Sequence, residues 1–392
     1  MGGVDQWANL HEDMLKEIIK RFYSYDEYPR FGLVCKQWNF NLPQIPRGNK
    51  VPCLLLPKAK KSSQNPTIFE GTLSKLSQKQ TRILEEKEIY HLTMPELQNN
   101  IIRGSCHGWI ITVSIDEGTI RMINPFTKVC FDLPPISTFP NVIDIHGDKC
   151  TYDFEEYVGT LDTVYMRTVN VSKVITNSAP NNDDFKAMAI YGNSKKLAFY
   201  FKPNSPRWIE FPTDHEEIMD VIFFQEKIYA KGFDFVLYEF DIKKNFAVVG
   251  VYEGTPPEEL DCSISQYSYL VGCDDDGSLL MLVRYVLSLM PTDSRPNLET
   301  IKFEVYKLNE KVWSRIYNLG NYALLVGLNS SVQILASNCK GNTIYFTDNM
   351  DGIGPTDYVR GHDIGIFNLE DGSCERVLSD VSLFCPPIWI LP

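Results

Sequence analysis

From about residue 89 onward, apolar residues come in short alternating runs, and no convincing long helix interrupts them. Each run has the length of a strand and is bounded by Gly, Asn, Asp, Ser or Pro, a pattern typical of short strands joined by turns. This part of the chain therefore predicts an all-β domain. The runs cover residues 109–115, 119–123, 187–191, 197–201, 221–224, 227–230, 237–240, 269–272, 279–284, 303–308, 323–326, 343–347 and 365–369.

A weak internal repeat runs through the same region, in which an apolar residue and a polar turn precede a second strand. The repeated segments begin at Ile123, Phe201, Phe240, Tyr306 and Phe367. Successive starts differ by 78, 39, 66 and 61 residues. The first gap fits two units of 39 with a hidden member near Asp162, and loops lengthen the later gaps. A period of about 40 to 50 residues with four short strands per unit predicts a β-propeller.

Five visible repeats and one hidden repeat favour six blades. A seventh blade, assembled from Val51–Leu56 and the C-terminus, is the alternative. In either case the terminal PPIWILP can close the ring by pairing with the early strand, so that neither edge is left bare. An orthogonal β-sandwich would contain the same strands but would lack the period.

The first forty residues differ from the rest because their apolar residues have helical spacing. One helix face is predicted to carry Leu10, Met14, Leu15, Ile18, Ile19 and Phe22. Asp26, Glu27 and Pro29 can open a second short helix, and a third follows over Phe31–Trp38. Three short helices are too few to bury a strong core alone, so such a unit usually completes itself against a partner. The alternative is an N-terminal cap that packs on the rest of the chain.

The residue types in this helical stretch resemble the F-box motif over roughly residues 5–45. The resemblance rests on WxxLxxDxLxxI from Trp7 and RFxxVCxxW from Arg30. It implies docking onto a Skp1-type adaptor and, through it, a cullin-based ubiquitin ligase. The adaptor contacts that it implies are Leu10, His11, Leu15, Ile18, Val34, Cys35 and Trp38. F-boxes commonly have Leu-Pro where this chain has Leu10-His11, so we expect a less rigid first helical turn.

A second resemblance joins this module to the β domain. GSCHGW from Gly104, INP from Ile123 and LPP from Leu133 follow one another. Together they resemble the plant F-box-associated domain long called domain of unknown function 295, which joins an F-box to a kelch-like propeller. The implied organisation is mainly β with a small α module: a three-helix F-box at 1–48 and a propeller at 49–392.

Charge and composition limit the classes of partner and the cellular compartment that we expect. The net charge of −12 and the pI of about 5.1 argue against nucleic acid or anionic membrane as the main partner, since both are usually met by basic surface. Ten cysteines without a CxxC pair indicate a reduced compartment. The polar start shows no secretory signal, and no apolar run is long enough for a membrane-spanning helix. We therefore expect the protein in the cytoplasm, the nucleus or both.

Two motifs suggest chemistry, but each has a plainer interpretation. GSCHG from Gly104 places Cys106 in a G-x-nucleophile-x-G pattern, yet a strand and not a helix follows, which favours a tight turn. The contiguous Asp274–Asp276 do not alternate as calcium ligands do, which favours a hairpin turn. The six histidines have no zinc-binding spacing. We therefore expect no catalytic residue, no cofactor and no metal.

The resulting hypothesis is a substrate-recognition subunit of a Skp1–cullin–F-box ubiquitin ligase, whose propeller holds a protein target. The first alternative is a scaffold that sequesters a signalling kinase or transcription factor without degrading it. A propeller enzyme or small-molecule binder with an incidental helical cap is a further alternative. The best candidates for target-binding loops are the insertions Met290–Asn297 and Pro140–Glu156.

Overall fold

We analysed a computed structural model of the chain. The structure describes residues 10–19, 31, 34–35, 38, 52–60, 68–75, 89–97, 99–154, 157–201, 206–211, 217–233, 235–244, 247–254, 264–289, 297–337, 339–348, 363–376 and 387–390.

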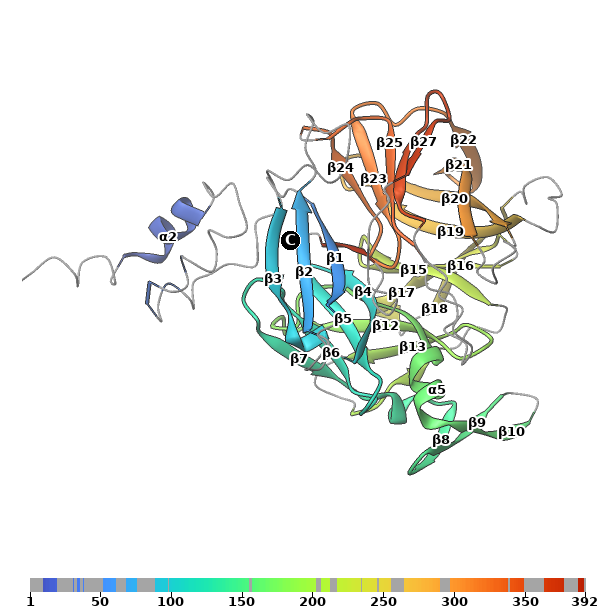
Figure 1. Ribbon diagram of the computed structural model, residues 1–392. Helices are drawn as coiled ribbons and strands as arrows, with labels where there is room; N and C mark the ends of the chain where they lie inside the picture. The colour runs from blue at the N-terminus through green and yellow to red at the C-terminus, as the bar shows by residue number, and fades with distance from the viewer. Residues whose placement is uncertain are drawn as a thin grey trace, which may run out of the picture.

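Apart from the three strands of one insertion, the described strands group into six blades (Figure 1). Blade 1 contains β28 (Ile388–Ile390), β1 (Cys53–Lys60), β2 (Ile68–Lys75) and β3 (Ile89–Thr93). Blade 2 contains β4 (Asn100–Cys106), β5 (Trp109–Ser114), β6 (Ile120–Ile123) and β7 (Cys130–Leu133). Blade 3 contains β11 (Val171–Thr176), β12 (Lys186–Tyr191), β13 (Lys196–Phe201) and β14 (Ile209–Glu210). Blade 4 contains β15 (Ile218–Phe224), β16 (Lys227–Gly232), β17 (Leu237–Asp241) and β18 (Ala247–Tyr252).

Blades 5 and 6 share one nine-stranded sheet, joined by a single pair between Gly272 and Val332. Blade 5 contains β19 (Ile264–Gly272), β20 (Leu279–Leu289), β21 (Asn297–Asn309) and β22 (Val312–Ile316). Blade 6 contains β24 (Val332–Leu335), β23 (Tyr322–Val326), β25 (Thr343–Phe346), β26 (Gly365–Asn368) and β27 (Cys374–Arg376). Single 3-10 turns occur at η2 (Pro95–Leu97), η3 (Ile136–Thr138) and η4 (Ile242–Lys244).

Alternating side chains build the cores between the blades, as the period of two in a strand requires. On β12, Ala187 and Ala189 face a core shared with blade 2, whereas Met188 and Ile190 face a core shared with blade 4. On β1, Leu55 faces blade 2 and Leu54 faces blade 6. The remaining cores join blade 4 to blade 5 and blade 5 to blade 6. These six shared cores close the ring.

The C-terminal strand closes the ring, as the sequence predicts. β28 pairs antiparallel with β1, and Trp389 lies opposite Leu54. Blade 1 therefore takes one strand from the end of the chain and three from its beginning. The predicted β-propeller and the favoured count of six blades are confirmed, and the described strands form no seventh blade.

The prediction of a hidden repeat near Asp162 is wrong. The five visible repeats are the connections between the last two strands of blades 2 to 6. The 78-residue gap holds one blade and an insertion: β8 (Val142–His146), β9 (Lys149–Asp153), β10 (Val158–Asp162) and helix α5 (Thr163–Val169). Asp162 caps α5 by accepting a hydrogen bond from the Tyr165 N–H at 2.9 Å. The one blade that shows no visible repeat is blade 1.

Candidate functional site

The N-terminal module begins with helix α2 (Glu12–Ile19). The His11 carbonyl accepts hydrogen bonds from the N–H groups of Met14 and Leu15, at 3.0 and 3.1 Å. The His11 ring also lies 3.4 Å from the Asp13 N–H. Histidine therefore starts the helix where proline is usual. The second predicted helix lies outside the described residues, and only four residues of the third are described.

The apolar face of α2 packs on residues of the third predicted segment. Leu15 is fully buried against Phe31 and Trp38, whose ring centroids lie 4.5 Å apart. We call this group the module cluster: Leu15, Phe31 and Trp38, with Leu10, Ile18 and Cys35 partly buried around it. Five of the seven predicted adaptor contacts thus belong to one cluster, and Phe31, which the prediction left out, lies at its centre.

The other two predicted contacts, His11 and Val34, lie outside the module cluster and face solvent. The His11 side chain is 76% exposed and Val34 is 54% exposed. Met14 is 56% exposed although the helical spacing assigned it to the apolar face. An outside partner would therefore meet Met14, His11 and Val34 directly, and would meet Leu15 and Trp38 through the cluster that supports them.

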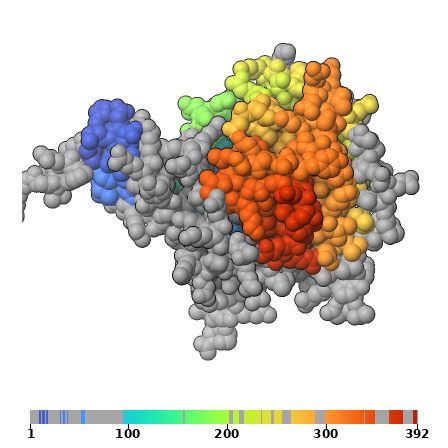
Figure 2. Space-filling view, turned by 90° about the horizontal axis from the view of Figure 1, so that it is seen from above, coloured from blue at the N-terminus to red at the C-terminus, as the bar shows by residue number. Residues whose placement is uncertain are grey.

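The module lies apart from the ring in both views (Figures 1 and 2). The described members of the module cluster all come from residues 10–38, and none comes from a blade. The alternative of a cap that packs on the strands therefore finds no support in the described part of the module.

The predicted target loop at Pro140–Glu156 contains β8 and β9, which form with β10 a three-stranded sheet that projects from the ring (Figure 1). Tyr152 packs on Phe154, and Phe154 stacks on Tyr157, with ring centroids 4.8 Å apart in both pairs. Several large apolar side chains of this insertion are exposed: Ile143, Tyr157, Val158 and Val164. The other predicted loop, Met290–Asn297, lies outside the described residues except for Asn297.

The turn that resembles a nucleophile elbow is a tight hairpin between β4 and β5. His107 and Gly108 have φ of 52° and 78°, as a two-residue turn requires. Cys106 is buried, and its Sγ lies 3.0 Å from the Thr176 hydroxyl. Burial raises the pKa of the Cys106 thiol to about 11, so the thiol is protonated at neutral pH and is a poor nucleophile.

The acidic run Asp274–Asp276 forms the predicted hairpin turn between β19 and β20. The Gly277 N–H donates to the Cys273 carbonyl at 2.9 Å, and Asp276 accepts from the Ser278 N–H at 3.0 Å. Within the described residues, no three His, Cys, Asp or Glu side chains form a group that could hold a metal ion. No helix in this part of the chain is long and apolar enough to cross a membrane.

The inner strands of blades 2, 3 and 4 each carry a β-bulge, at Arg103, Ser172 and Met219. Bulges redirect side chains and often occur beside functional sites. In blades 3 and 4 the residues after the bulge, Lys173 and Asp220, form a buried ion pair of 2.7 Å. No sequence pattern predicts this pair, because its members lie 47 residues apart.

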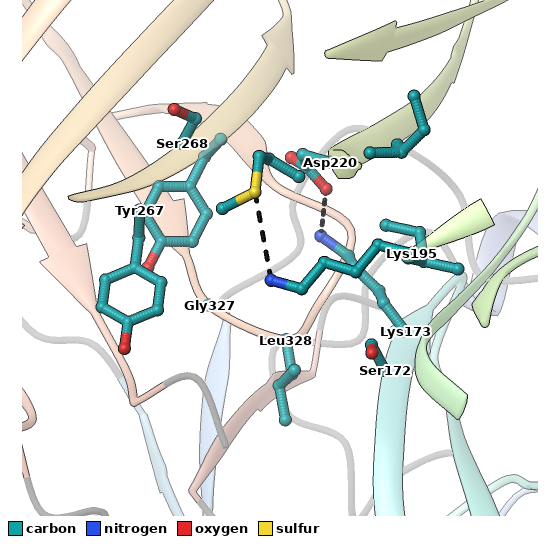
Figure 3. Close-up of a pocket in the computed structure, with 12 residues that line it drawn as sticks. Ser172, Lys173, Lys195, Asp220, Tyr267, Ser268, Gly327 and Leu328 are labelled. Carbon is teal, nitrogen blue, oxygen red and sulfur yellow. Dashed lines mark hydrogen bonds and ion pairs between the residues drawn. The ribbon is translucent and has the colours of Figure 1, made fainter. Parts of the chain in front are cut away.

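The Lys173–Asp220 pair forms one wall of a cavity of about 40 Å³ (Figure 3). Lys195, from the turn between β12 and β13, points into the same space, and its Nζ lies 4.0 Å from the Met219 sulfur. Tyr267 and Ser268 of β19 lie on the opposite side. We call this cavity the channel pocket.

The fold and the N-terminal module together define a class: β-propeller proteins with a short helical module in front of the ring. The chain belongs to the family described as KIB1-4 beta-propeller, which matches residues 80–368.

The relatives of the chain in Arabidopsis thaliana carry F-box names. F-box protein At2g26160 is 21% identical over 88% of this chain and 96% of its own length. A second chain with an F-box name, At3g25750, is 22% identical over 99% and 98%. These matches confirm the resemblance to plant F-box proteins with a propeller. Among solved structures, the Cps50 (Swd1) β-propeller of Myceliophteria thermophila covers 82% of this chain and 89% of its own, at 10% identity. Its TM-score against this chain is 0.31.

Proposed function

We propose that this chain is the substrate-recognition subunit of a Skp1–cullin–F-box ubiquitin ligase. The N-terminal module binds a Skp1-type adaptor, and the propeller holds a protein target. On this proposal the chain itself performs no chemistry. It holds a target beside the conjugating enzyme and so raises the effective concentration of the target's lysines. On this proposal it works in the cytoplasm, the nucleus or both.

The module cluster carries the proposal. Among the described residues it has three fully or nearly buried side chains, and a core of that size stabilises a domain only weakly. It also leaves Met14 and Val34 exposed beside it. F-box names among relatives that match along nearly the whole chain support the same conclusion.

A pull-down with a Skp1-type protein tests the proposal. The full chain is expected to recover the adaptor, and a chain without residues 1–48 is expected to lose it. Met14→Glu places a charge on the exposed apolar surface of α2 and should lower recovery strongly. Glu17→Gln, at an exposed position of the same helix, is the matched control. Equal recovery with all four proteins would overturn the proposal.

The projecting sheet is the part of the propeller that we propose for contact with the target. Its exposed apolar residues project beyond the ring, where a partner can reach them. Proximity labelling with the full chain and with a Tyr157→Ser/Val158→Ser variant should differ in the proteins captured. A ubiquitination assay on those proteins then distinguishes a ligase subunit from a scaffold that sequesters a kinase or transcription factor.

A further inference from the structure

We propose that the channel pocket binds an oxyanion, the phosphate or carboxylate group of a ligand. Three side chains that are charged at neutral pH line it: Lys173, Lys195 and Asp220. Two positive charges therefore face one negative charge at the centre of the ring, in a chain whose net charge is −12. The pocket therefore has a net positive charge although the protein as a whole is negatively charged.

Asp220 carries one negative charge, so it cannot neutralise both lysines, and its hydrogen bonds hold it against Lys173 and the backbone. Oδ1 accepts from the Lys173 Nζ at 2.7 Å and from the Val221 N–H at 2.9 Å. Oδ2 accepts from the Leu270 N–H at 2.8 Å. The remaining cation, Lys195, pairs with no carboxylate of the described part of the chain, and the nearby Met219 sulfur is a weak acceptor.

The backbone is distorted at the level of the channel pocket. The bulges at Ser172 and Met219 lie in neighbouring inner strands, and both bulged residues line the pocket. Two irregularities at one level, each directly followed by a charged residue, are typical of a site in which side chains must point away from the regular strand direction.

The hydroxyl groups and the volume of the channel pocket also fit a small oxyanion. Ser172, next to Lys173, and Ser268, on the side opposite the lysines, also line the pocket, and hydroxyl donors together with ammonium groups are the usual partners of an oxyanion. A cavity of about 40 Å³ has room for a few waters or for one small anionic group, but not for a nucleotide or a flat cofactor. The inference goes beyond the proposed function and holds whether or not the module recruits an adaptor.

Thermal unfolding of the full chain with inorganic phosphate tests the inference. Sodium chloride of equal ionic strength serves as the reference, because it screens charges to the same extent but supplies no oxyanion. Binding to the native state should raise the unfolding midpoint in a saturable way. In Lys195→Gln the phosphate concentration for half the effect should rise about tenfold or more, the loss expected for one charge-assisted hydrogen bond.

Two further variants make the result specific to the channel pocket. Lys196→Gln removes a neighbouring lysine that pairs with Glu210 instead, and it should respond to phosphate as the unaltered chain does. Lys195→Arg keeps the charge and should retain the response. A response that follows ionic strength alone, or that is equal in Lys195→Gln and Lys196→Gln, would overturn the inference.

The same assay distinguishes the two sources of the anion. If capped phosphoserine acts at lower concentration than inorganic phosphate, the pocket binds an anionic group carried by a polypeptide. If inorganic phosphate acts at lower concentration, the pocket binds the free ion. Either order supports an oxyanion site, whereas failure of both compounds contradicts it.

Discussion

The ring and the N-terminal module bury their apolar residues in different ways. Each of the six cores of the ring is shared by two blades and contains eight or more buried side chains among the described residues. Among the described residues, the module cluster contains three. Hydrophobic stabilisation scales with the apolar area that is buried, so the described part of the module is held far more weakly than any core of the ring. This contrast is the reason that we propose the module, and not the ring, as the adaptor-binding part.

The largest expected effect comes from opening the ring at its closing strand. Trp389 is fully buried and packs edge-on against Tyr345, with centroids 6.1 Å apart. Trp389→Ala should lower the free energy of unfolding by about 3–5 kcal/mol, measured by urea denaturation. Trp389→Phe is the control and should cost much less, because the buried Trp389 Nε1 has no hydrogen-bond partner in the described structure. A small loss in Trp389→Ala, no greater than that in Trp389→Phe, would show that closure of the propeller does not depend on the Trp389 side chain.

The same substitution in both regions sharpens the comparison further. Leu55 in the ring and Leu15 in the module are both fully buried. Leu55→Ala should cost about 2–5 kcal/mol of unfolding free energy. Leu15→Ala should leave the main unfolding transition unchanged but weaken adaptor binding by about 2 kcal/mol. A shift of the main transition by Leu15→Ala equal to that of Leu55→Ala would show that the two regions unfold as one.

The pH dependence of unfolding tests how much the Glu304 carboxylate contributes to the stability of the ring. Burial raises the pKa of Glu304, but hydrogen bonds from Lys302, Tyr285 and Tyr306 outweigh it and lower the pKa from 4.5 to about 2. Because the folded pKa lies below the unfolded one, Glu304 stabilises the protein above pH 4.5. That contribution, about 2–3 kcal/mol, is lost as the pH falls toward 2.

Glu304→Gln should therefore lower stability at neutral pH and flatten its decline between pH 4.5 and 2. The exposed Glu375→Gln is the control and should leave the pH profile of urea unfolding unchanged. An unaltered profile in Glu304→Gln would contradict the assignment.

The smallest expected effect concerns the first turn of α2. His11→Pro presets the backbone angle at the start of the helix, a change worth about 0.4–1 kcal/mol when the native conformation accommodates it. Adaptor affinity, measured by calorimetry, should therefore rise by about two- to fivefold. His11→Ala is the control and should not rise. A loss of affinity in His11→Pro would show that the adaptor contacts the histidine ring itself.

Local patterns in the sequence predicted the local parts of the fold. Alternation of apolar residues found the strands, and helical spacing found α2, because both depend on residues close along the chain. Sheet membership is not local. The strands of the insertion, such as β9, have the same pattern as those of a blade, so the gap after Ile123 was interpreted as two repeats.

The module cluster and the channel pocket differ in the same way: the first depends on local sequence patterns and the second does not. The members of the module cluster lie within thirty residues of one another and within recognisable motifs, so most of them could be named from the sequence. The channel pocket depends on bulges in two strands and on an ion pair between residues 173 and 220. A bulge shifts the register by one residue, and nothing in either strand's composition indicates where it falls.

Hydrogen exchange of the full chain with and without a Skp1-type adaptor tests the contrast between module and ring most directly. Amides of Glu12–Ile19 should exchange rapidly in the free chain and gain strong protection in the complex, since a small cluster opens readily until a partner covers it. Protection of the ring strands, such as β5 and β20, should stay the same. Protection of α2 that is already strong without the adaptor, or that does not change when the adaptor is added, would contradict the account.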